Sequence, residues 1–584
     1  MNTLWIVGIG FLLYVILYHT WGKRLAQSLL KVSDENPTPS QLKQDGIDYV
    51  PTPRTVLFGH HFASIAGAAP IVGPVIALAW GWVPALLWVW FGNVLIGATH
   101  DYLSLMASVR HEGRSIEWIA GGLISRRTSL MFRVFILFTL ILIIGAFSAI
   151  IAAIFAKNPA VGSASFFFIL AAVITGFLLY RVRVQLWLGT VIGLFLVILG
   201  ILAGIELPLR FSLNQWLLLL LIYMTIAASL PVWALLQPRD YLNAFLLWGG
   251  LILGGIALMV VHAGLNLPTF TTWSAPTIGG VPSPFWPTIP LVIACGALSG
   301  FHSLVASGTT SKQLARESDA LFVGMGGMFT EGFLSTVVIA SVGAFGLTVL
   351  QQHGVSAQDS LQFARDYGAV LKEVGGPVGL FSLSFAEVVS RMIPLSKQII
   401  AVFASLWVSA FALTTLDTTT RIGRFTLNEV LDPVRDRVPG LVSFLTQNWV
   451  ASFLVSLAGV LLAWGALWRL LWPAFGGANQ MLASIALMTV TVWVFLTMRH
   501  AGFLYRLAVL LPTLFLWITI TSALIWYLVV PLKKFFSTNP VQAVVLGIIV
   551  SVEIVLNIVL FWDAFRTIVA HRAIQKEPGP APTA

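Results

Sequence analysis

The sequence GHHFASIAGAAPIVGP fills residues 59–74, inside an apolar segment that runs from about residue 57 to residue 79. Small residues and two prolines, Pro70 and Pro74, crowd its middle, so the stretch is a poor candidate for an unbroken helix. Interruptions of this kind in membrane helices expose unwound backbone N–H and C=O groups around a binding cavity. The stretch therefore predicts a discontinuous membrane helix beside a binding site.

The composition places the whole chain in a lipid bilayer. Of its 584 residues, 58% are apolar and only 10% are charged, whereas a soluble domain carries roughly 25% charged residues. The single cysteine, Cys295, can form no intramolecular disulfide and is expected to be a small core residue. The net charge of +10 comes with no basic block, so we expect lipid headgroups and no nucleic acid as its partner. A soluble enzyme, a disordered scaffold and a disulfide-rich secreted module are excluded.

Hydropathy predicts an all-α polytopic membrane protein with about fifteen spanning helices, since each needs roughly 20 apolar residues. The predicted spans are residues 3–21, 57–79, 82–107, 130–155, 161–180, 186–206, 214–236, 241–265, 288–308, 321–350, 393–417, 441–466, 479–498, 505–530 and 541–565. Most of the 33 basic residues fall in alternate loops, which predicts an outside N-terminus and a cytoplasmic C-terminus. Lys533 and Lys534 depart from this pattern.

A second interruption is predicted in the seventh segment, where AASLPVWALLQP at residues 227–238 contains Pro231 and Pro238. On the loop count the second and seventh segments run in opposite directions. Two broken helices five spans apart are typical of a five-plus-five inverted repeat, here segments two to six and seven to eleven. The alternative is that both are proline kinks without function, which membrane helices tolerate easily.

The repeat divides the chain into three expected parts. Residues 1–54 hold the first helix and a loop, residues 55–420 hold the transport core, and residues 421–584 hold accessory helices. Within the core, the repeats are expected at 55–210 and 211–420, with the substrate site between the two breaks. The residues expected to line that site are Ser64, Gly67, Ala68, Ala69, Pro70, Ser229, Pro231 and Trp233.

Ionisable side chains inside the predicted spans need a reason, because each costs about 2.5–3.5 kcal/mol to insert. The set is His60, His61, His100, Asp101, His302, Lys312, Glu331 and Asp417. His60, His61 and Lys312 lie near helix ends, where an interfacial position explains them equally well. His100 and Asp101 are neighbours and point about 100° apart, so their partners are expected on other helices. Glu331, within GGMFTEG, is expected to be a proton-linked or substrate-facing carboxylate, with a structural hydrogen-bond anchor as the alternative.

A run of hydroxyl groups follows in SGFHSLVASGTTSK at residues 299–312. Hard cations prefer oxygen ligands, so Ser307, Thr309 and Thr310 are candidates for binding Na⁺. The alternatives are hydrogen bonds to their own helix, or Lys312 in place of the cation. The coupling cation, H⁺ or Na⁺, is the only cofactor expected. A transition metal at the histidines stays open, because their spacing is unspecific.

Several motifs between about residues 55 and 490 resemble one family. They are FGHHF at 58–62 with AGAAPIVGP at 66–74, THDY at 99–102, LPVW at 230–233 with LQPRDY at 236–241, SGFH at 299–302 with SGTT at 307–310, TEG at 330–332, LTTLDTTTR at 413–421 and FGGANQMLA at 475–483. Together they resemble the carbon starvation protein A (CstA) family of bacterial inner-membrane transporters. The resemblance implies uptake of peptides, or of pyruvate for some relatives, coupled to an ion gradient during nutrient limitation. It also implies a LeuT-type core of the amino acid–polyamine–organocation superfamily.

The expected function is therefore secondary active import of peptides by alternating access, with a pyruvate/proton symporter as the alternative. The half-helix N-termini at the breaks are expected to attract the substrate carboxylate. No GxxxxGK[ST] loop and no HExxH motif occur, so neither ATP-driven pumping nor enzymatic activity is expected. An intramembrane metal-dependent hydrolase and a membrane sensor remain as rival classes, and the oligomeric state stays open.

Overall fold

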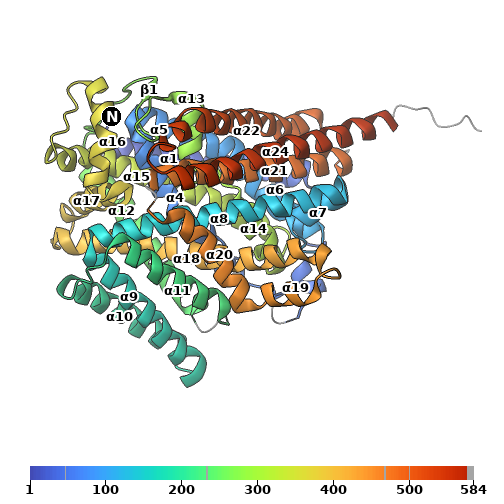
Figure 1. The fold of residues 1–584 in the computed structure, drawn as a ribbon, viewed down its shortest axis with the longest axis horizontal. Coiled ribbons are helices and arrows are strands. Elements are labelled where there is room, and N and C mark those ends of the chain that lie inside the picture. Colours follow the sequence, from blue (N-terminus) through green and yellow to red (C-terminus); the bar gives the residue numbers. More distant parts are fainter. Residues whose placement is uncertain (46–47, 232–234, 466–467, 499, 575–584) are drawn as a thin grey trace, which may run out of the picture.

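Helices make up nearly all of the fold (Figure 1). The computed structural model describes residues 1–45, 48–231, 235–465, 468–498 and 500–574. The first twelve helices are α1 (Thr3–Leu17), α2 (Pro39–Leu42), α3 (Arg54–Ile65), α4 (Ala69–Ala77), α5 (Trp82–Gly92), α6 (Ala98–Arg110), α7 (Ile116–Leu123), α8 (Arg126–Lys157), α9 (Pro159–Phe177), α10 (Leu186–Glu206), α11 (Leu213–Ser229) and α12 (Leu236–Val261).

The second half continues after a small antiparallel pair of strands, β1 (Ser274–Ala275) and β2 (Ser283–Pro284). Its helices are α13 (Phe285–Val292), α14 (Phe301–Gly308), α15 (Gly326–Gln351), α16 (Ser360–Glu373), α17 (Gly376–Ser390), α18 (Lys397–Leu431), α19 (Pro439–Leu445), α20 (Asn448–Ala463), α21 (Trp468–Thr497), α22 (Phe503–Val529), α23 (Pro531–Phe535) and α24 (Pro540–Ile574). A π-helical turn at Asn93–Gly97 joins α5 to α6, and another at Leu321–Met325 precedes α15.

The chain is a multi-pass membrane protein. Among the described residues, 11 helices are long and apolar enough to cross a bilayer, or 13 if each of two bent helix pairs is one span. The predicted count of about fifteen is not confirmed, because the predicted spans 214–236 and 288–308 are not among these candidates. The first ends early, because α11 stops at Ser229, and the second splits into two helices of eight residues.

The first predicted break is confirmed. α3 ends at Ile65, α4 begins at Ala69, and the two helices meet at an angle of 49°. Pro70 occupies the first turn of α4, where its missing N–H removes no helical hydrogen bond. The proline therefore starts a new half-helix instead of kinking a continuous one.

The second break lies elsewhere than predicted. Ser229 ends α11 and α12 begins at Leu236, so Pro231 lies in an exposed connection between two helices. The interrupted element is instead α13 with α14, which are separated by unwound residues 293–300. Gly296, at φ +80°, adopts the left-handed backbone that a side chain disfavours, and it directs the chain out of the helix.

The two interrupted elements run antiparallel through the centre of the protein. α3 packs on α14, whereas α4 packs on α13, so the first half of each contacts the second half of the other. Gly73 makes the contact close, because a Cβ there would lie 2.6 Å from the carbonyl oxygen of Val292. This approach of two backbones brings both breaks to one place.

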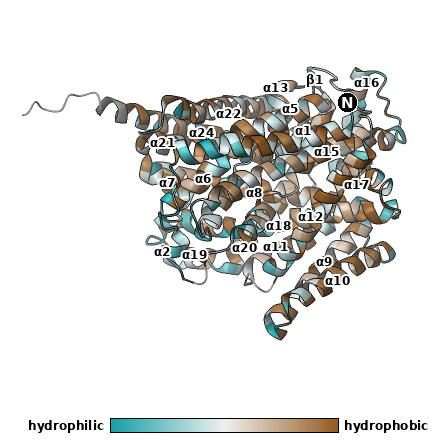
Figure 2. Cartoon of the chain, turned by 180° about the vertical axis from the view of Figure 1, so that it is seen from behind, coloured by the Kyte–Doolittle hydropathy of each residue, from teal (hydrophilic) through white to brown (hydrophobic). Residues whose placement is uncertain are grey.

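Long buried helices surround this crossing, and apolar helices face the lipid outside them. α8 and α18 pack on each other and on α20. The α9–α10 hairpin projects from the rest of the fold in Figure 1, and α10 exposes large apolar side chains such as Trp187 and Phe195. In Figure 2 the long helices are mainly hydrophobic, while hydrophilic residues gather near α2 and α19. The predicted domain limit at residue 420 falls inside α18, and the predicted division of the chain into repeats stays a prediction.

Candidate functional site

Side chains from neighbouring elements hold the two breaks against each other. The Asn93 amide donates hydrogen bonds of 2.8 Å to the carbonyl oxygens of Gly296 and Met328. Ser335 on α15 donates to the carbonyl oxygen of Pro70 over 2.7 Å. The Gly296 carbonyl in the second break and the Pro70 carbonyl at the start of α4 thus gain polar partners, which buried backbone groups require.

Two amides on α21 support the second break. Asn479 donates to the carbonyl oxygen of Ala294 over 2.8 Å, and its side-chain oxygen accepts the Phe301 N–H over 3.0 Å. Gln480 donates to the carbonyl oxygen of Ile293 over 2.7 Å. These two amides were not among the site residues predicted from the sequence. They lie in the FGGANQMLA motif, and polar amides in an otherwise apolar helix could have indicated a structural or binding role.

A chain of buried ionisable groups lies beside the crossing. Two imidazoles approach the carboxylate of Asp101: the Nδ1 atoms of His100 and His302 each lie 2.7 Å from one of its oxygens. His302 Nε2 lies 3.5 Å from Glu331 Oε2. All four side chains are fully buried. The expected partner on another helix is therefore present for Asp101, but its neighbour His100 also turns its ring to the same carboxylate.

Cys295 belongs to this group as well. It is buried in the unwound segment, and its sulfur, a His302 ring nitrogen and a Glu331 oxygen lie within 4.8 Å of one another. The segment that breaks the helix therefore places the thiol of the chain's single cysteine beside two other metal-ligating side chains.

The hydroxyl groups predicted to bind Na⁺ have other partners. Ser307 and Thr309 donate to carbonyl oxygens of their own helix over 2.7 and 3.0 Å, as in the alternative considered from sequence. Thr310 lies 2.8 Å from His61 Nδ1 and so connects the end of α14 to α3. The Lys312 ammonium lies over the ring of Tyr49, away from these hydroxyls. A sodium site at this position stays a prediction.

Asp417 belongs to a separate cluster on α18. Arg239 on α12 forms an ion pair with Asp417 and a second one, at 2.7 Å, with Asp240. Tyr223 donates to Asp417 over 2.9 Å. The structure therefore neutralises the Asp417 carboxylate with a buried guanidinium, whereas Glu331 has no arginine or lysine partner among the described ion pairs.

The predicted substrate residues fall into two separated groups. Ser64, Gly67, Ala68, Ala69 and Pro70 surround the first break, at the crossing. Ser229 instead lies at the end of α11, where it donates to the carbonyl oxygen of its own helix residue Thr225. Pro231 lies in the connection after α11, and Trp233 lies outside the described residues. The partner of the first break is the segment 293–300.

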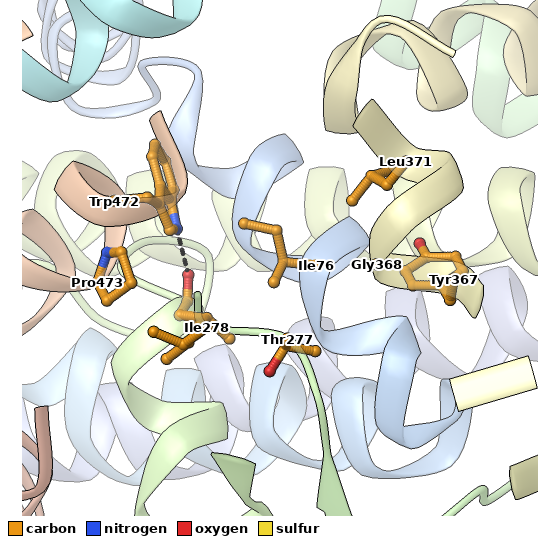
Figure 3. A pocket seen from close by; sticks show the side chains of 9 residues that line it. Ile76, Thr277, Ile278, Tyr367, Gly368, Leu371, Trp472 and Pro473 are labelled. Carbon is orange, nitrogen blue, oxygen red and sulfur yellow. Dashed lines mark hydrogen bonds between the residues drawn. The ribbon is translucent and has the colours of Figure 1, made fainter. Parts of the chain in front are cut away.

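On the α16 side of the crossing the helices are held together by hydrogen bonds and leave little free space. A cavity of about 20 Å³ between α4, α16 and α21 is lined by Ile76, Tyr367 and Trp472 (Figure 3), which is room for about one or two water molecules. Tyr367 donates to the carbonyl oxygen of Val75 over 2.6 Å, and Trp472 donates to that of Val292 over 2.9 Å. These bonds fasten α16 and α21 over the two broken helices.

Comparison with known proteins gives one consistent family. The family described as "Carbon starvation protein CstA" matches residues 2–523. The chain is 33% identical to "Peptide transporter CstA" of Escherichia coli (strain K12), over 90% of this chain and 81% of that protein. It is 32% identical to "Pyruvate/proton symporter BtsT" of the same organism, over 92% of this chain and 82% of that protein. A solved structure of the Eremococcus coleocola manganese transporter, at 13% identity and a TM-score of 0.42, covers 90% of this chain and 99% of its own.

Proposed function

Because the chain belongs to the carbon starvation protein CstA family, we propose that it is a secondary active transporter that imports a small carboxylate-bearing solute. Its relatives include proteins named peptide transporter and one named pyruvate/proton symporter. A peptide C-terminus and pyruvate share the carboxylate. A peptide is the first candidate, since most of the named relatives are peptide transporters, and pyruvate is the second.

The crossing of two antiparallel broken helices is the observation that carries this proposal. α4 begins at Ala69 and α14 begins at Phe301, so both half-helix N-termini start at the breaks. A helix N-terminus carries about half a positive charge and free N–H groups, which favour an anion. A carboxylate bound there would touch both interrupted elements at once, and a relative movement of the two would then change access to it.

Access from the two sides differs in the way that alternating access requires. On the side covered by α16, Tyr367 is hydrogen-bonded to α4 and lines the small cavity of Figure 3. On the α3 side of the break, His60 is exposed, and Ser64 and Asp240 are partly exposed. These polar side chains are where a route from the surface toward the crossing would begin.

The packing supports a five-plus-five inverted repeat with other limits than the sequence predicted. The first repeat would run from α3 to α12 and the second from α13 to α21, with the α9–α10 hairpin as an insertion. Corresponding elements then pack in pairs, α8 on α18 and α11 on α20. The basic loops support an outside N-terminus and a cytoplasmic C-terminus in a bacterial inner membrane.

Uptake in proteoliposomes tests the proposal. Labelled dipeptide and labelled pyruvate are supplied separately under an imposed proton gradient, a sodium gradient or neither, with protein-free liposomes as control. We expect at least one solute to accumulate above its external concentration under one gradient, and to leak out when an ionophore collapses that gradient. Failure of both solutes to accumulate under either gradient contradicts active import.

A further inference from the structure

We propose that Cys295, His302 and Glu331 form a binding site for a divalent transition metal ion. The three side chains come from the unwound segment, α14 and α15, and all three are buried. One potential ligand atom of each lies within 4.8 Å of the others. This inference concerns metal binding by the protein at rest and does not depend on the proposed transport activity.

The orientation of His302 is that of a metal ligand. Its Nδ1 lies 2.7 Å from Asp101 Oδ2, so an Nδ1 proton donated to this carboxylate leaves Nε2 as a lone pair. Metal-bound histidines are commonly oriented in this way by a carboxylate on the other ring nitrogen. His100 holds the second oxygen of Asp101 over 2.7 Å and fixes the carboxylate in turn.

Nε2 of His302 faces the Glu331 carboxylate, which accepts hydrogen bonds but donates none while it is ionised. Glu331 Oε2 lies 3.5 Å from Nε2, and the backbone N–H of Gly296 is another polar group near this carboxylate. A carboxylate buried without compensation costs several kcal/mol. Two facing acceptors in a buried pocket are stabilised by a metal ion or by a proton between them, and the metal ion is the occupant that we propose.

The third ligand decides the class of cation. Na⁺ and Ca²⁺ select oxygen atoms, whereas a thiolate, an imidazole and a carboxylate together suit Zn²⁺ and similar ions. The thiolate and the Glu331 carboxylate would neutralise a divalent ion. Ligand distances of about 2.0–2.3 Å require the side chains to close by about 1 Å around it, and three protein ligands leave a fourth position open.

Cobalt spectroscopy tests the site, because a thiolate bound to Co²⁺ gives a charge-transfer band in the near ultraviolet. The chain has one cysteine, so such a band can come only from Cys295. The full-length protein, purified without a histidine tag, is titrated with Co²⁺ in detergent, and Zn²⁺ is then added as a competitor. We expect one Co²⁺ per chain, the charge-transfer band, and displacement by Zn²⁺.

Variants assign the ligands. Cys295→Ser should remove the charge-transfer band, and Glu331→Gln should weaken Co²⁺ binding by about 10–100-fold, the size of effect that even outer-shell changes reach. His353→Gln, at an exposed histidine whose Nδ1 lies 3.5 Å from Glu373, is the matched control and should bind Co²⁺ as the wild type does. A wild-type protein that binds neither ion, or binds Co²⁺ without the thiolate band, overturns the proposal. A proton between His302 and Glu331 would give that result.

Discussion

Gly73 offers a direct perturbation of the crossing between the two broken helices. A Cβ at this position would lie 2.6 Å from the carbonyl oxygen of Val292 and 2.8 Å from the Cα of Ile293. Both neighbours are backbone atoms, which cannot rotate away. Ordinary van der Waals contact begins near 3.4 Å, so Gly73→Ala forces α4 and α13 apart by about 0.8 Å, because the close-packed interior offers no free space.

The added methyl group overpacks the contact between α4 and α13, which lowers the stability of that contact. Inserting a methyl group into a close-packed contact costs about 1–3 kcal/mol. If substrate binds only when the breaks are in contact, the equilibrium between the protein with and without this contact shifts by the same free energy. The fraction of protein that can bind substrate then decreases. The apparent affinity should then fall by about 5–150-fold, since 1.4 kcal/mol is tenfold.

The assay compares Gly73→Ala with Gly59→Ala in proteoliposomes. Gly59 is one of the glycines of the same motif, and a Cβ there meets no atom within 4 Å. We expect the initial rate of uptake at limiting substrate to fall by about 5–150-fold in Gly73→Ala, with unchanged uptake in Gly59→Ala. Normal uptake by a folded Gly73→Ala protein, or an equal loss in both variants, would refute the reasoning that contact of the breaks creates the site.

Three further predictions concern polar contacts. Asn479→Leu leaves the Ala294 carbonyl oxygen and the Phe301 N–H without their side-chain partner and should lower the free energy of unfolding by about 1–3 kcal/mol per group; an unchanged melting temperature in detergent contradicts this. Asp417→Asn leaves the buried Arg239 short of one carboxylate and should cost about 3 kcal/mol; equal thermal stability of variant and wild type would show that the ion pair is dispensable. Lys43 donates a hydrogen bond to Glu112 and holds the pKa of that carboxyl below its usual range. The contact should therefore persist above the ordinary Glu pKa of 4.5 and be lost as pH falls through the lowered value. In Lys43→Gln the pKa of Glu112, followed by NMR titration, should return to its ordinary value, and an unshifted midpoint would contradict the contact.

The sequence could predict the first break because its causes are local. Small residues and two prolines within residues 66–74 disfavour a continuous helix whatever surrounds them. The second break depends on tertiary contacts. The carbonyls freed after Pro290 are satisfied by Asn479 and Gln480, which lie 185 and 187 positions further along the chain, so no local pattern around Pro290 predicts the break.

The sequence predicted which ionisable residues belong to the candidate site, but it did not predict which of them contact one another. Asp101, His302 and Glu331 stand out because charge in an apolar segment is costly. Asp101 and His302 are 201 positions apart and His302 and Glu331 lie on different helices, so nothing in the local sequence sets these contacts. Asp417 also stands out in the sequence as a buried charge, but it belongs to another cluster. Its partner, Arg239, is 178 positions away, so the sequence did not predict this ion pair.

Substrate protection at single cysteines tests most directly whether the crossing is the binding site. Ser64→Cys and Ser229→Cys are compared in a Cys295→Ser background, which removes the native cysteine. Both serines are partly exposed; Ser64 lies at the crossing, and Ser229 lies at the end of α11, where the sequence predicted the second break. The rate of modification by a thiol reagent is measured with and without saturating dipeptide or pyruvate. The account predicts that substrate slows modification at Ser64→Cys and leaves Ser229→Cys unchanged. Protection at Ser229→Cys alone, or at neither position for a solute that is transported, would contradict it.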